Sequence, residues 1–464
     1  MRYDLVIVGM GSGGLVAAEF ASSLGLRVAA VERDRVGGDC LWTGCVPSKA
    51  LLASAKVAHH LRTADRYGMS PVEPNIDLGA VWRRIHAVQA QIAGTDDDPA
   101  RFEAMGVELV RGEARLVGAN AVQVDGRTLE ARRILLCTGS HPATPDVPGL
   151  EEAGYLTSEN VFELERPPSS VVVLGGGPIG VELAQGLNRL GVRVTLLQKG
   201  DRLVPRDEPE LGEILSRVLS DEGVDLHFGV EATGVTTTDG VKVVESKNGG
   251  RFEADGILVA IGRSPAIDGL GLEEIGVEVE RRGIVVDDRM RTNVSSIYAV
   301  GDVAGRHHFT HTAAHEGAMA VRDMFFPGKS KASELVPWTT FTDPELAHVG
   351  MTVAEAQERK GVENVGVERV DLAHSDRARA EGTIEGRIVL VTVREKIVGA
   401  HILAPAAGEM IHELALAIDK GLKLRDLASL IHVYPTMTTS VNLLAADAAY
   451  RYARRFRWLA KLAR

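Results

Sequence analysis

A unit of apolar strand, glycine-rich turn and helix occurs twice in the chain, and it limits the folds that the chain can adopt. The first copy begins with DLVIVG at residues 4–9, passes Gly9, Gly11 and Gly14, and continues in the helical pattern LVAAEFASSLG. Glycines at this spacing permit a tight turn and bring the backbone and the positive helix N-terminus close to a pyrophosphate. The next strand ends at Glu32, about 20 residues further on, where a carboxylate binds ribose hydroxyls.

The second copy is VVVLGGGPIGVELAQGLNRLGVRVTLLQ, at residues 171–198. Gly175, Gly177 and Gly180 follow its first strand, and its second strand ends at Gln198, in the place that Glu32 has in the first copy. Two such units predict two dinucleotide sites between which electrons pass.

Composition limits the setting. The 464 residues have 45% hydrophobic content and a net charge of −11, which predicts about three domains and argues against nucleic acid as a partner. The N-terminus resembles no signal peptide, and no apolar run reaches the roughly 20 residues of a membrane span. We therefore expect a cytoplasmic protein, in which three cysteines do not form a secreted disulfide framework.

Two cysteines lie close together in GGDCLWTGCVPSKALL, at residues 37–52. The pattern that follows predicts a helix starting near Cys45, and its N-terminus together with Lys49 would favour a thiolate. Cys40 and Cys45 could instead be inert buried residues or half of a zinc site. No second Cys or His pair has zinc-ligand spacing, so we predict no metal site.

The cysteine segment resembles the redox-active disulfide segment of the flavoprotein disulfide reductases, such as dihydrolipoamide dehydrogenase, glutathione and mycothione reductases, and mercuric reductase. The resemblance extends over the chain through LLCTGSHPATPDVPG (135–149), LVAIGRSPAI (258–267), IYAVGDVAG (297–305) and FTDPELAHVGMT (341–352). It implies an α/β fold with two Rossmann-like dinucleotide-binding domains and a C-terminal α/β dimerisation domain.

The same resemblance implies domain boundaries and cofactor contacts. The FAD-binding domain would comprise residues 1–146 and 267–333, the NAD(P)-binding domain residues 147–266, and the dimerisation domain residues 334–464. FAD would be bound by Gly9, Gly11, Gly14, Glu32, Thr138, Gly139 and Asp302. NADPH or NADH would be bound by Gly175, Gly177, Gly180, Gln198, Lys199 and Gly262.

Position 198 bears on the choice of nicotinamide. An acid there would bind the 2′-hydroxyl of NADH, whereas a nearby cation would favour the 2′-phosphate of NADPH. Gln198 does neither strongly, and Lys199 and Arg202 could neutralise a phosphate or simply be solvated turn charges. We expect both cofactors to be used, with a modest preference for NADPH.

The resemblance also assigns chemical roles. The nicotinamide would deliver hydride to one face of the flavin, and Cys45 would be the charge-transfer thiolate on the other. Cys40 would exchange with the acceptor, because exchange needs an accessible thiolate. Lys49 and Glu182 would form an ion pair beside the flavin's reactive nitrogen, the alternative being a plain surface salt bridge. The chain would be a homodimer in which each interface domain completes the other subunit's active site.

One segment departs from the family pattern. Members that reduce organic disulfides carry His-Pro-Thr followed shortly by Glu, a dyad for proton transfer to the leaving thiol. The matching segment here is IHVYPTMTTSVNLLAA, with Tyr434 at the histidine position and Thr439 at the glutamate position. Mercuric reductases also lack the histidine but carry a C-terminal cysteine pair, whereas this chain has no cysteine after Cys137.

These residues predict an NAD(P)H-dependent FAD oxidoreductase that keeps the Cys40–Cys45 disulfide and passes electrons to a quinone or metal ion. A first alternative is a dihydrolipoamide dehydrogenase-like or other low-molecular-weight disulfide reductase in which Tyr434 or His432 replaces the dyad. A second is a vestigial flavin-binding redox sensor, against which the intact cysteine segment argues.

Two further segments invite interpretation. The tail AAYRYARRFRWLAKLAR predicts a short basic amphipathic helix with Tyr452, Phe456 and Leu459 on one face. We expect it to dock on its own acidic dimer; weak contact of residues 450–464 with an anionic membrane surface is the alternative. The histidines at 307, 308, 311 and 315 have no accompanying carboxylates in a ligand pattern, so we assign them no metal.

Overall fold

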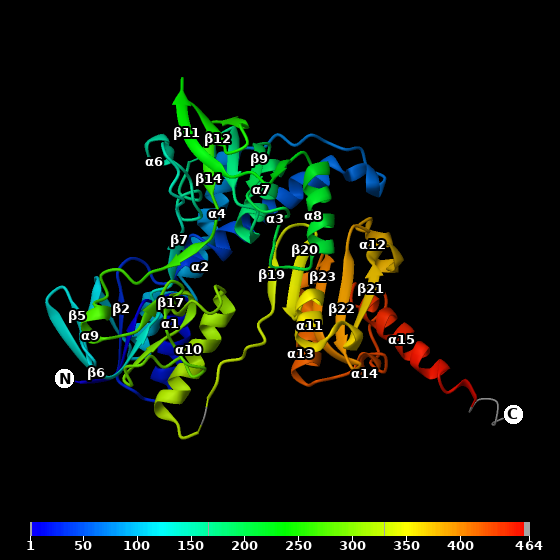
Figure 1. The fold of residues 1–464 in the computed structure, drawn as a ribbon. Coiled ribbons are helices and arrows are strands. Elements are labelled where there is room, and N and C mark those ends of the chain that lie inside the picture. Colours follow the sequence, from blue (N-terminus) through cyan, green and yellow to red (C-terminus); the bar gives the residue numbers. More distant parts are fainter. Residues whose placement is uncertain (1, 166, 329, 459–464) are drawn as a thin grey trace.

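The structure is a computed structural model that describes residues 2–165, 167–328 and 330–458 (Figure 1). Its first sheet has the order β3-β2-β1-β6-β5-β4, with β18 paired to β6. The pairs β1–β2, β1–β6, β2–β3 and β6–β18 are parallel. Nearly every residue of β1 is buried, as expected for a parallel strand covered on both faces. The strands are β1 (Tyr3–Val8), β2 (Val28–Glu32), β3 (Glu108–Arg111), β4 (Ala114–Gly118), β5 (Ala121–Val124), β6 (Arg127–Leu136) and β18 (Ile297–Ala299).

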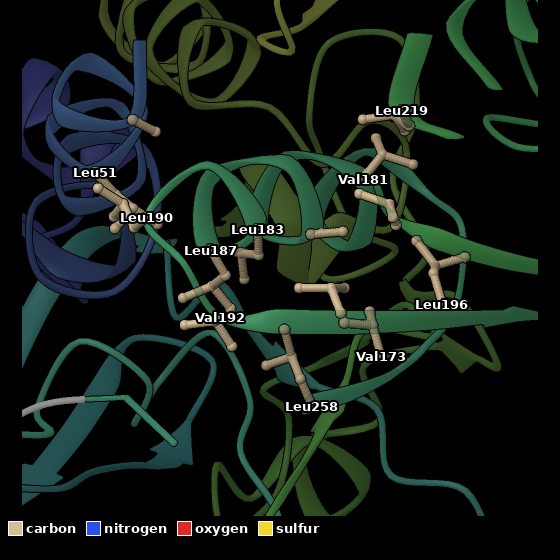
Figure 2. Close-up of a cluster of buried hydrophobic side chains, with 14 of the residues drawn as sticks. Leu51, Val173, Val181, Leu183, Leu187, Leu190, Val192, Leu196, Leu219 and Leu258 are labelled. Atoms are coloured by element: carbon tan, nitrogen blue, oxygen red, sulfur yellow. The ribbon is translucent and has the colours of Figure 1, made fainter. Parts of the chain in front are cut away.

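A second, smaller parallel sheet with the order β10-β9-β8-β14 belongs to the second glycine-rich unit. Its core is formed by side chains of β8, β9 and α7 (Figure 2). Leu51, which comes from the cysteine segment, packs into this same cluster. The elements are β8 (Ser170–Leu174), α7 (Pro178–Arg189), β9 (Arg193–Gln198), α8 (Pro209–Asp221), β10 (Asp225–Phe228) and β14 (Gly256–Val259). Three antiparallel strands, β11 (Ala232–Thr238), β12 (Val241–Ser246) and β13 (Arg251–Ala254), form a further sheet.

Two short antiparallel strands join these parts. They are β7 (Ser140–Pro142) and β15 (Arg263–Pro265), and they lie in the two segments predicted as crossovers. Because both crossings pair with each other, the second unit is inserted into the first through one two-stranded link.

The C-terminal part is a five-stranded antiparallel sheet, β19-β20-β23-β22-β21, with helices packed against it (Figure 1). It has its own core. The fold is therefore α/β, with two Rossmann-like units and a C-terminal α/β domain, as predicted. The elements are β19 (Trp338–Thr340), β20 (Glu345–Gly350), α11 (Val353–Lys360), β21 (Val365–Asp371), α12 (Asp376–Glu381), β22 (Arg387–Val393), β23 (Lys396–Ala404), α13 (Ala407–Asp419), α14 (Leu424–Leu427) and α15 (Thr439–Arg454).

The helices around the cysteines connect the two Rossmann-like units. The helix predicted near Cys45 is α3 (Cys45–Arg62), and it begins at that residue.

The predicted domain boundaries themselves stay predictions. In the described ranges, no helix is both long enough and apolar enough to cross a membrane. The remaining elements are α1 (Ser12–Ser23), α2 (Gly38–Trp42), α4 (Leu78–Ala93), α5 (Pro99–Ala104), α6 (Leu150–Ala153), α9 (Leu272–Ile275), β16 (Val279–Glu280), β17 (Gly283–Ile284), α10 (Thr310–Phe325) and short 3₁₀ turns η1 (Ala64–Tyr67), η2 (Gly301–Ala304), η3 (Val362–Asn364) and η4 (Leu372–His374).

Candidate active site

A cavity of about 1510 Å³ brings the first glycine-rich turn and both clustered cysteines together. It runs from the carboxyl ends of β1 and β2 to the interface domain. The predicted residues that line it are Gly9, Gly11, Glu32, Cys40, Cys45, Lys49, Thr138, Gly139, Glu182 and Asp302. Residues predicted from separate motifs therefore line the same cavity.

The first glycine-rich turn forms a cradle that side chains would fill. A Cβ on Gly9, whose φ is +99°, would lie 2.4 Å from the Cys137 carbonyl oxygen. A Cβ on Gly14 would lie 2.0 Å from the Gly9 oxygen, so α1 could not pack this closely on β1. Glu32 accepts hydrogen bonds from the backbone N–H groups of Met10 (2.8 Å) and Asp34 (2.9 Å). Turn, helix end and carboxylate are arranged as a dinucleotide requires.

Farther along the cavity, Asp302 belongs to a polar network of which the sequence predicted only Asp302 itself. Its Oδ2 accepts from the Ser140 hydroxyl at 2.5 Å and lies 3.6 Å from the Arg263 guanidinium. Arg263 also pairs with Asp39, beside Cys40, at 3.3 Å, and its side chain is only 10% exposed. Arg263 lies in the segment LVAIGRSPAI, and this family-like segment was the sequence feature from which its role could have been predicted.

The two cysteines differ in their electrostatics. Both are free thiols; Cys40 is half-buried on α2, and Cys45 is exposed to the cavity at the first residue of α3. A hydrogen bond from Cys40 lowers the pKa of Cys45 to about 6, with help from Thr310 and Lys49 and against the effect of burial. The same hydrogen bond, and burial, raise the pKa of Cys40. Cys45 is thus the sulfur that ionises first.

Thr310 is a residue that the sequence did not single out. Its Oγ1 lies 3.3 Å from the Cys45 sulfur, at the N-terminus of α10. The two residues are 265 positions apart, and a threonine at a helix start is common, so no local pattern marks this contact.

Lys49 and Glu182 form the predicted ion pair, with Nζ and Oε2 2.9 Å apart. The Glu182 side chain is only 8% exposed, and its Oε1 accepts from the Phe341 backbone N–H at 2.8 Å. The Lys49 ammonium also lies 4.3 Å from the Phe341 ring centroid. The pair is therefore no plain surface salt bridge, and it joins α3, α7 and the interface domain; its place beside a flavin nitrogen stays a prediction.

The second glycine-rich turn repeats the first in detail. A Cβ on Gly175 (φ +109°) would lie 2.5 Å from the Ala260 oxygen, and one on Gly180 2.0 Å from the Gly175 oxygen, whereas Gly177 faces open space. The side-chain Oε1 of Gln198 accepts from the Gly176 backbone N–H at 2.9 Å. Gly262 (φ +135°) also faces open space, in the link between the units.

Lys199, predicted to bind the nicotinamide cofactor, is engaged within the protein. Its ammonium pairs with Glu231 at 2.5 Å. Arg202 donates to the Pro205 carbonyl at 3.0 Å. A 2′-phosphate would therefore compete with Glu231 for Lys199.

Comparison with known proteins now fixes the family. Residues 3–317 match the family described as pyridine nucleotide-disulphide oxidoreductase, and residues 336–445 match its dimerisation domain. The chain is a pyridine nucleotide-disulphide oxidoreductase. It is consequently an NAD(P)H-dependent flavoprotein oxidoreductase that uses FAD, and its dimerisation domain indicates a homodimer.

Individual relatives of the oxidoreductase cover nearly the whole chain. It is 34% identical to a mercuric reductase of Bacillus cereus, over 95% of this chain and 70% of that protein. It is 36% identical to a dihydrolipoyl dehydrogenase of Thermus scotoductus, over 97% of this chain and 98% of that one. The HOCl-induced flavoprotein disulfide reductase RclA from Escherichia coli has a similar structure, with a TM-score of 0.86 and 27% identity over 96% of this chain and 99% of that chain.

In this oxidoreductase, Tyr434 takes the histidine position in an exposed loop. The peptide bond between Tyr434 and Pro435 is cis, and Tyr434 is 67% exposed. The phenol donates a hydrogen bond to Asp376 at 2.9 Å, and that bond and the carboxylate charge raise the pKa of Tyr434. Thr439 lies nearby, accepting from the Thr436 backbone N–H at 3.2 Å.

His432, the other candidate substitute, points elsewhere. Its Nε2 lies 3.0 Å from a carboxylate oxygen of Glu413, on α13, and the side chain is only 6% exposed. A histidine–carboxylate pair therefore exists two residues before Tyr434, but within the subunit's own packing.

Of the four histidines at 307, 308, 311 and 315, His308 and His311 line the cavity. His311 is hydrogen-bonded to the Pro337 carbonyl at 2.8 Å, and its ring stacks on Phe309. Throughout the described part of the chain, no group of three or more His, Cys, Asp or Glu side chains is arranged to hold a metal ion.

The C-terminal helix α15 docks on its own subunit. Arg451 pairs with Glu368 at 2.5 Å, and the Tyr452 ring lies 4.9 Å from the Arg425 guanidinium. Tyr450 and Trp458 are exposed. Leu459 and the rest of the predicted tail helix, residues 460–464, lie outside the described residues.

Proposed function

We propose that this oxidoreductase passes electrons from NADPH or NADH, by way of FAD and the Cys40–Cys45 pair, to a metal ion or a quinone rather than to an organic disulfide. The observation that carries the proposal is Tyr434 at the position of the family's proton-transferring histidine, with its hydroxyl committed to Asp376.

Reduction of an organic disulfide leaves a thiolate that must be protonated, and a positioned acid contributes about 10²–10⁴-fold to such a step. A phenol, with an ordinary pKa of about 10, is a weak acid and no base at neutral pH. Asp376 raises the pKa of Tyr434 further. Disulfide turnover would therefore lack its usual proton donor.

Metal ions and quinones avoid that step. FAD supplies hydride acceptance from the nicotinamide and release of the electron pair. Oxidation of the two thiols to a disulfide releases two electrons and two protons. A quinone takes both electrons and both protons. Two Cu(II) ions or one Hg(II) ion take the two electrons only, and the two protons pass to solvent. Thiolates are soft ligands that suit such metals.

The names of similar proteins support a metal acceptor. A mercuric reductase is among the relatives. RclA is also known as a Cu(II) complex, whose structure matches this chain with a TM-score of 0.87 and 26% identity. With no other metal-ligating cluster in the described ranges, Cys40 and Cys45 are the sulfur ligands that we propose for an incoming ion.

The second candidate is a disulfide reductase, and one observation favours it. His432 and Glu413 form a histidine–carboxylate pair that could move a proton, although the imidazole is buried. A vestigial flavin-binding redox sensor is the third, and the intact cysteine segment, with both thiols lining the cavity, argues against it.

We also propose that Tyr434 and Thr439 face Cys40 of the other subunit. The loop before Tyr434 exposes apolar side chains, with Ile431 95% and Val433 76% exposed. Such a patch is typical of a surface that a partner covers.

The test is anaerobic NADPH oxidation by the FAD-loaded protein with lipoamide, a soluble quinone or Cu(II) as acceptor. We expect turnover with quinone or Cu(II) and negligible turnover with lipoamide. Tyr434→His combined with Thr439→Glu should raise lipoamide turnover by about 10²-fold or more, and Tyr434→Phe should leave quinone and Cu(II) turnover unchanged.

Cys40→Ala separates the routes. If Cu(II) turnover is lost and quinone turnover survives, the ion takes electrons from the dithiol and the quinone takes them from the flavin. Fast lipoamide turnover by the wild type, abolished by His432→Gln, would instead establish the disulfide reductase. Absence of turnover with every acceptor would favour the sensor.

A further inference from the structure

A second cavity, of about 490 Å³, lies where β1 begins, at the end of that strand opposite to Gly9. In Figure 1 this region is beside the N-terminus and β6. Four arginines line it: Arg2, Arg27, Arg132 and Arg133. None of its lining residues lines the cavity of the cysteines, so it is separate from the proposed active site.

The charge in this cavity is almost uncompensated. Asp4 is its one acidic lining residue; it lies 3.4 Å from the Arg132 guanidinium and accepts from the Arg27 backbone N–H at 3.0 Å. Within the described ranges, no carboxylate oxygen lies within 4.0 Å of the guanidinium of Arg2, Arg27 or Arg133. Four cations thus face one anion, in a chain with a net charge of −11.

The guanidinium groups also have hydrogen-bond donors to spare. Arg2 donates to the Ala131 carbonyl at 3.4 Å, Arg133 to the Arg132 carbonyl at 3.4 Å, and Arg27 to the Arg2 carbonyl. The Arg133 Nε is buried without an acceptor. Each guanidinium has five N–H donors, and these bonds use only a few of them.

The geometry points to a binding site for a compact, multiply charged phosphate anion, such as a pyrophosphate or triphosphate group. Guanidinium forks match phosphate oxygens in pairs, and charge-assisted bonds of this kind are the strong ones. The single aromatic lining residue is Tyr3, which is buried and donates its hydroxyl to Glu108 at 2.6 Å. It offers no face to a base, so the site recognises the phosphates, whether free or on a nucleotide.

The test is calorimetric titration of the FAD-loaded protein with sodium triphosphate and, in a second arm, ATP. Sodium sulfate at equal ionic strength controls for general screening. The variant is Arg27→Gln combined with Arg132→Gln, both at exposed positions. The matched control is Arg359→Gln, an exposed arginine on α11. Far-UV circular dichroism and flavin content check folding.

We expect wild type and the Arg359 variant to bind one triphosphate per subunit, and the double variant to bind at least about tenfold more weakly, since two charge-assisted contacts are lost. Equal affinity for ATP and triphosphate would show that the site recognises the phosphates alone. Tighter binding of ATP would show that the site recognises a nucleotide. The proposal is overturned if sulfate gives the same heat, which would mean that the anion is not selected, or if the double variant binds as tightly as wild type, which would mean that the anion binds elsewhere.

Discussion

Single polar atoms distinguish the two dinucleotide units. Glu32 and Gln198 end equivalent strands, and each holds a backbone N–H of its own glycine-rich turn, at 2.8 and 2.9 Å respectively. The amide thus preserves the acceptor of the carboxylate without its charge. We therefore expect one substitution at position 198 to change cofactor recognition without changing the turn.

Gln198→Glu tests this reading. The new carboxylate keeps the Gly176 hydrogen bond but repels a 2′-phosphate and attracts a 2′-hydroxyl. We expect the NADPH/NADH ratio of kcat/KM to fall by about tenfold or more, since two charges at about 4 Å interact by a few kcal/mol near a protein surface. Steady-state kinetics with both cofactors measure it, and an unchanged ratio contradicts the assignment. Gln123→Glu, in β5 of the first sheet, is the control.

Thr310 acts on the Cys45 thiolate over 3.3 Å. Thr310→Val removes the hydroxyl at nearly constant volume, so we expect the pKa of Cys45 to rise from about 6 by roughly one unit. Thiolate forms above that pKa and is lost below it. The pH dependence of thiolate ultraviolet absorbance in the reduced protein, with Cys45→Ser as the blank, reports the shift; identical midpoints in wild type and variant would exclude a role for the hydroxyl.

The residues found from sequence were those that local patterns mark. Cys40, Cys45 and Lys49 lie within one segment. Gly9 and Gly175 lie in turns whose geometry requires glycine, and Glu32 and Gln198 end the strands that follow. Thr310 and the pairing of Arg263 with Asp39 depend on how distant segments fold together. Lys199 illustrates the reverse case, because it pairs with Glu231, just before β11 and 32 positions away, and this partner could not be predicted from the sequence around position 199.

Among the elements, α3 couples the thiols to the second unit. Its first residue is Cys45, its next turn supplies Lys49 for Glu182 on α7, and Leu51 packs into the cluster that contains the α7 side chains, next to Leu190 (Figure 2). The sequence predicted where this helix starts, since the cysteine segment and a helical pattern adjoin. Which helix it would pack against depended on long-range contacts.

Helix α15 was predicted as basic and amphipathic, and its Tyr452 face packs on the subunit. Tyr450 and Arg454, and Arg455 and Trp458 just beyond the helix, are exposed. We propose a weak attraction to anionic lipid, about 1 kcal/mol per arginine near the surface. Co-sedimentation with phosphatidylserine vesicles at low salt should fall when residues 450–464 are deleted, and vesicles of phosphatidylcholine should bind neither form. Sedimentation that is the same with and without the tail would eliminate the contact.

Across the whole molecule, Trp338 joins all three parts of the fold. Its ring stacks on Phe309, from the loop before α10, with centroids 5.9 Å apart, and on His348 of the interface sheet at 3.6 Å. Its Nε1 donates to Asp207, from the second unit, at 2.8 Å. Asp207 is buried, and burial raises its pKa to about 6.

A buried carboxylate with a raised pKa destabilises the folded state once it ionises. The native protein binds the proton more tightly, so this destabilisation is complete above about pH 6 and disappears as the pH falls toward 4. Asp207→Asn keeps an acceptor for Trp338. We expect it to raise the free energy of unfolding at pH 8 by up to about 3 kcal/mol and to have no effect near pH 4.

Urea unfolding at both pH values measures this difference. Asp201→Asn, at an exposed position, is the control and should change neither value. A gain for Asp207→Asn that is the same at pH 8 and pH 4 would mean that ionisation of this carboxyl is not its cause.

The equivalence of the two glycine-rich turns has an evolutionary consequence. In such a repeated module, the scaffold that holds the turn and the group that we expect to bind the ribose are separable, because an amide and a carboxylate both accept a hydrogen bond from the equivalent backbone N–H. After duplication, selection could retune one copy through a single codon while the other stayed committed to its cofactor. We therefore expect the nicotinamide preference of such a reductase to be adjustable through position 198 at little cost to its architecture.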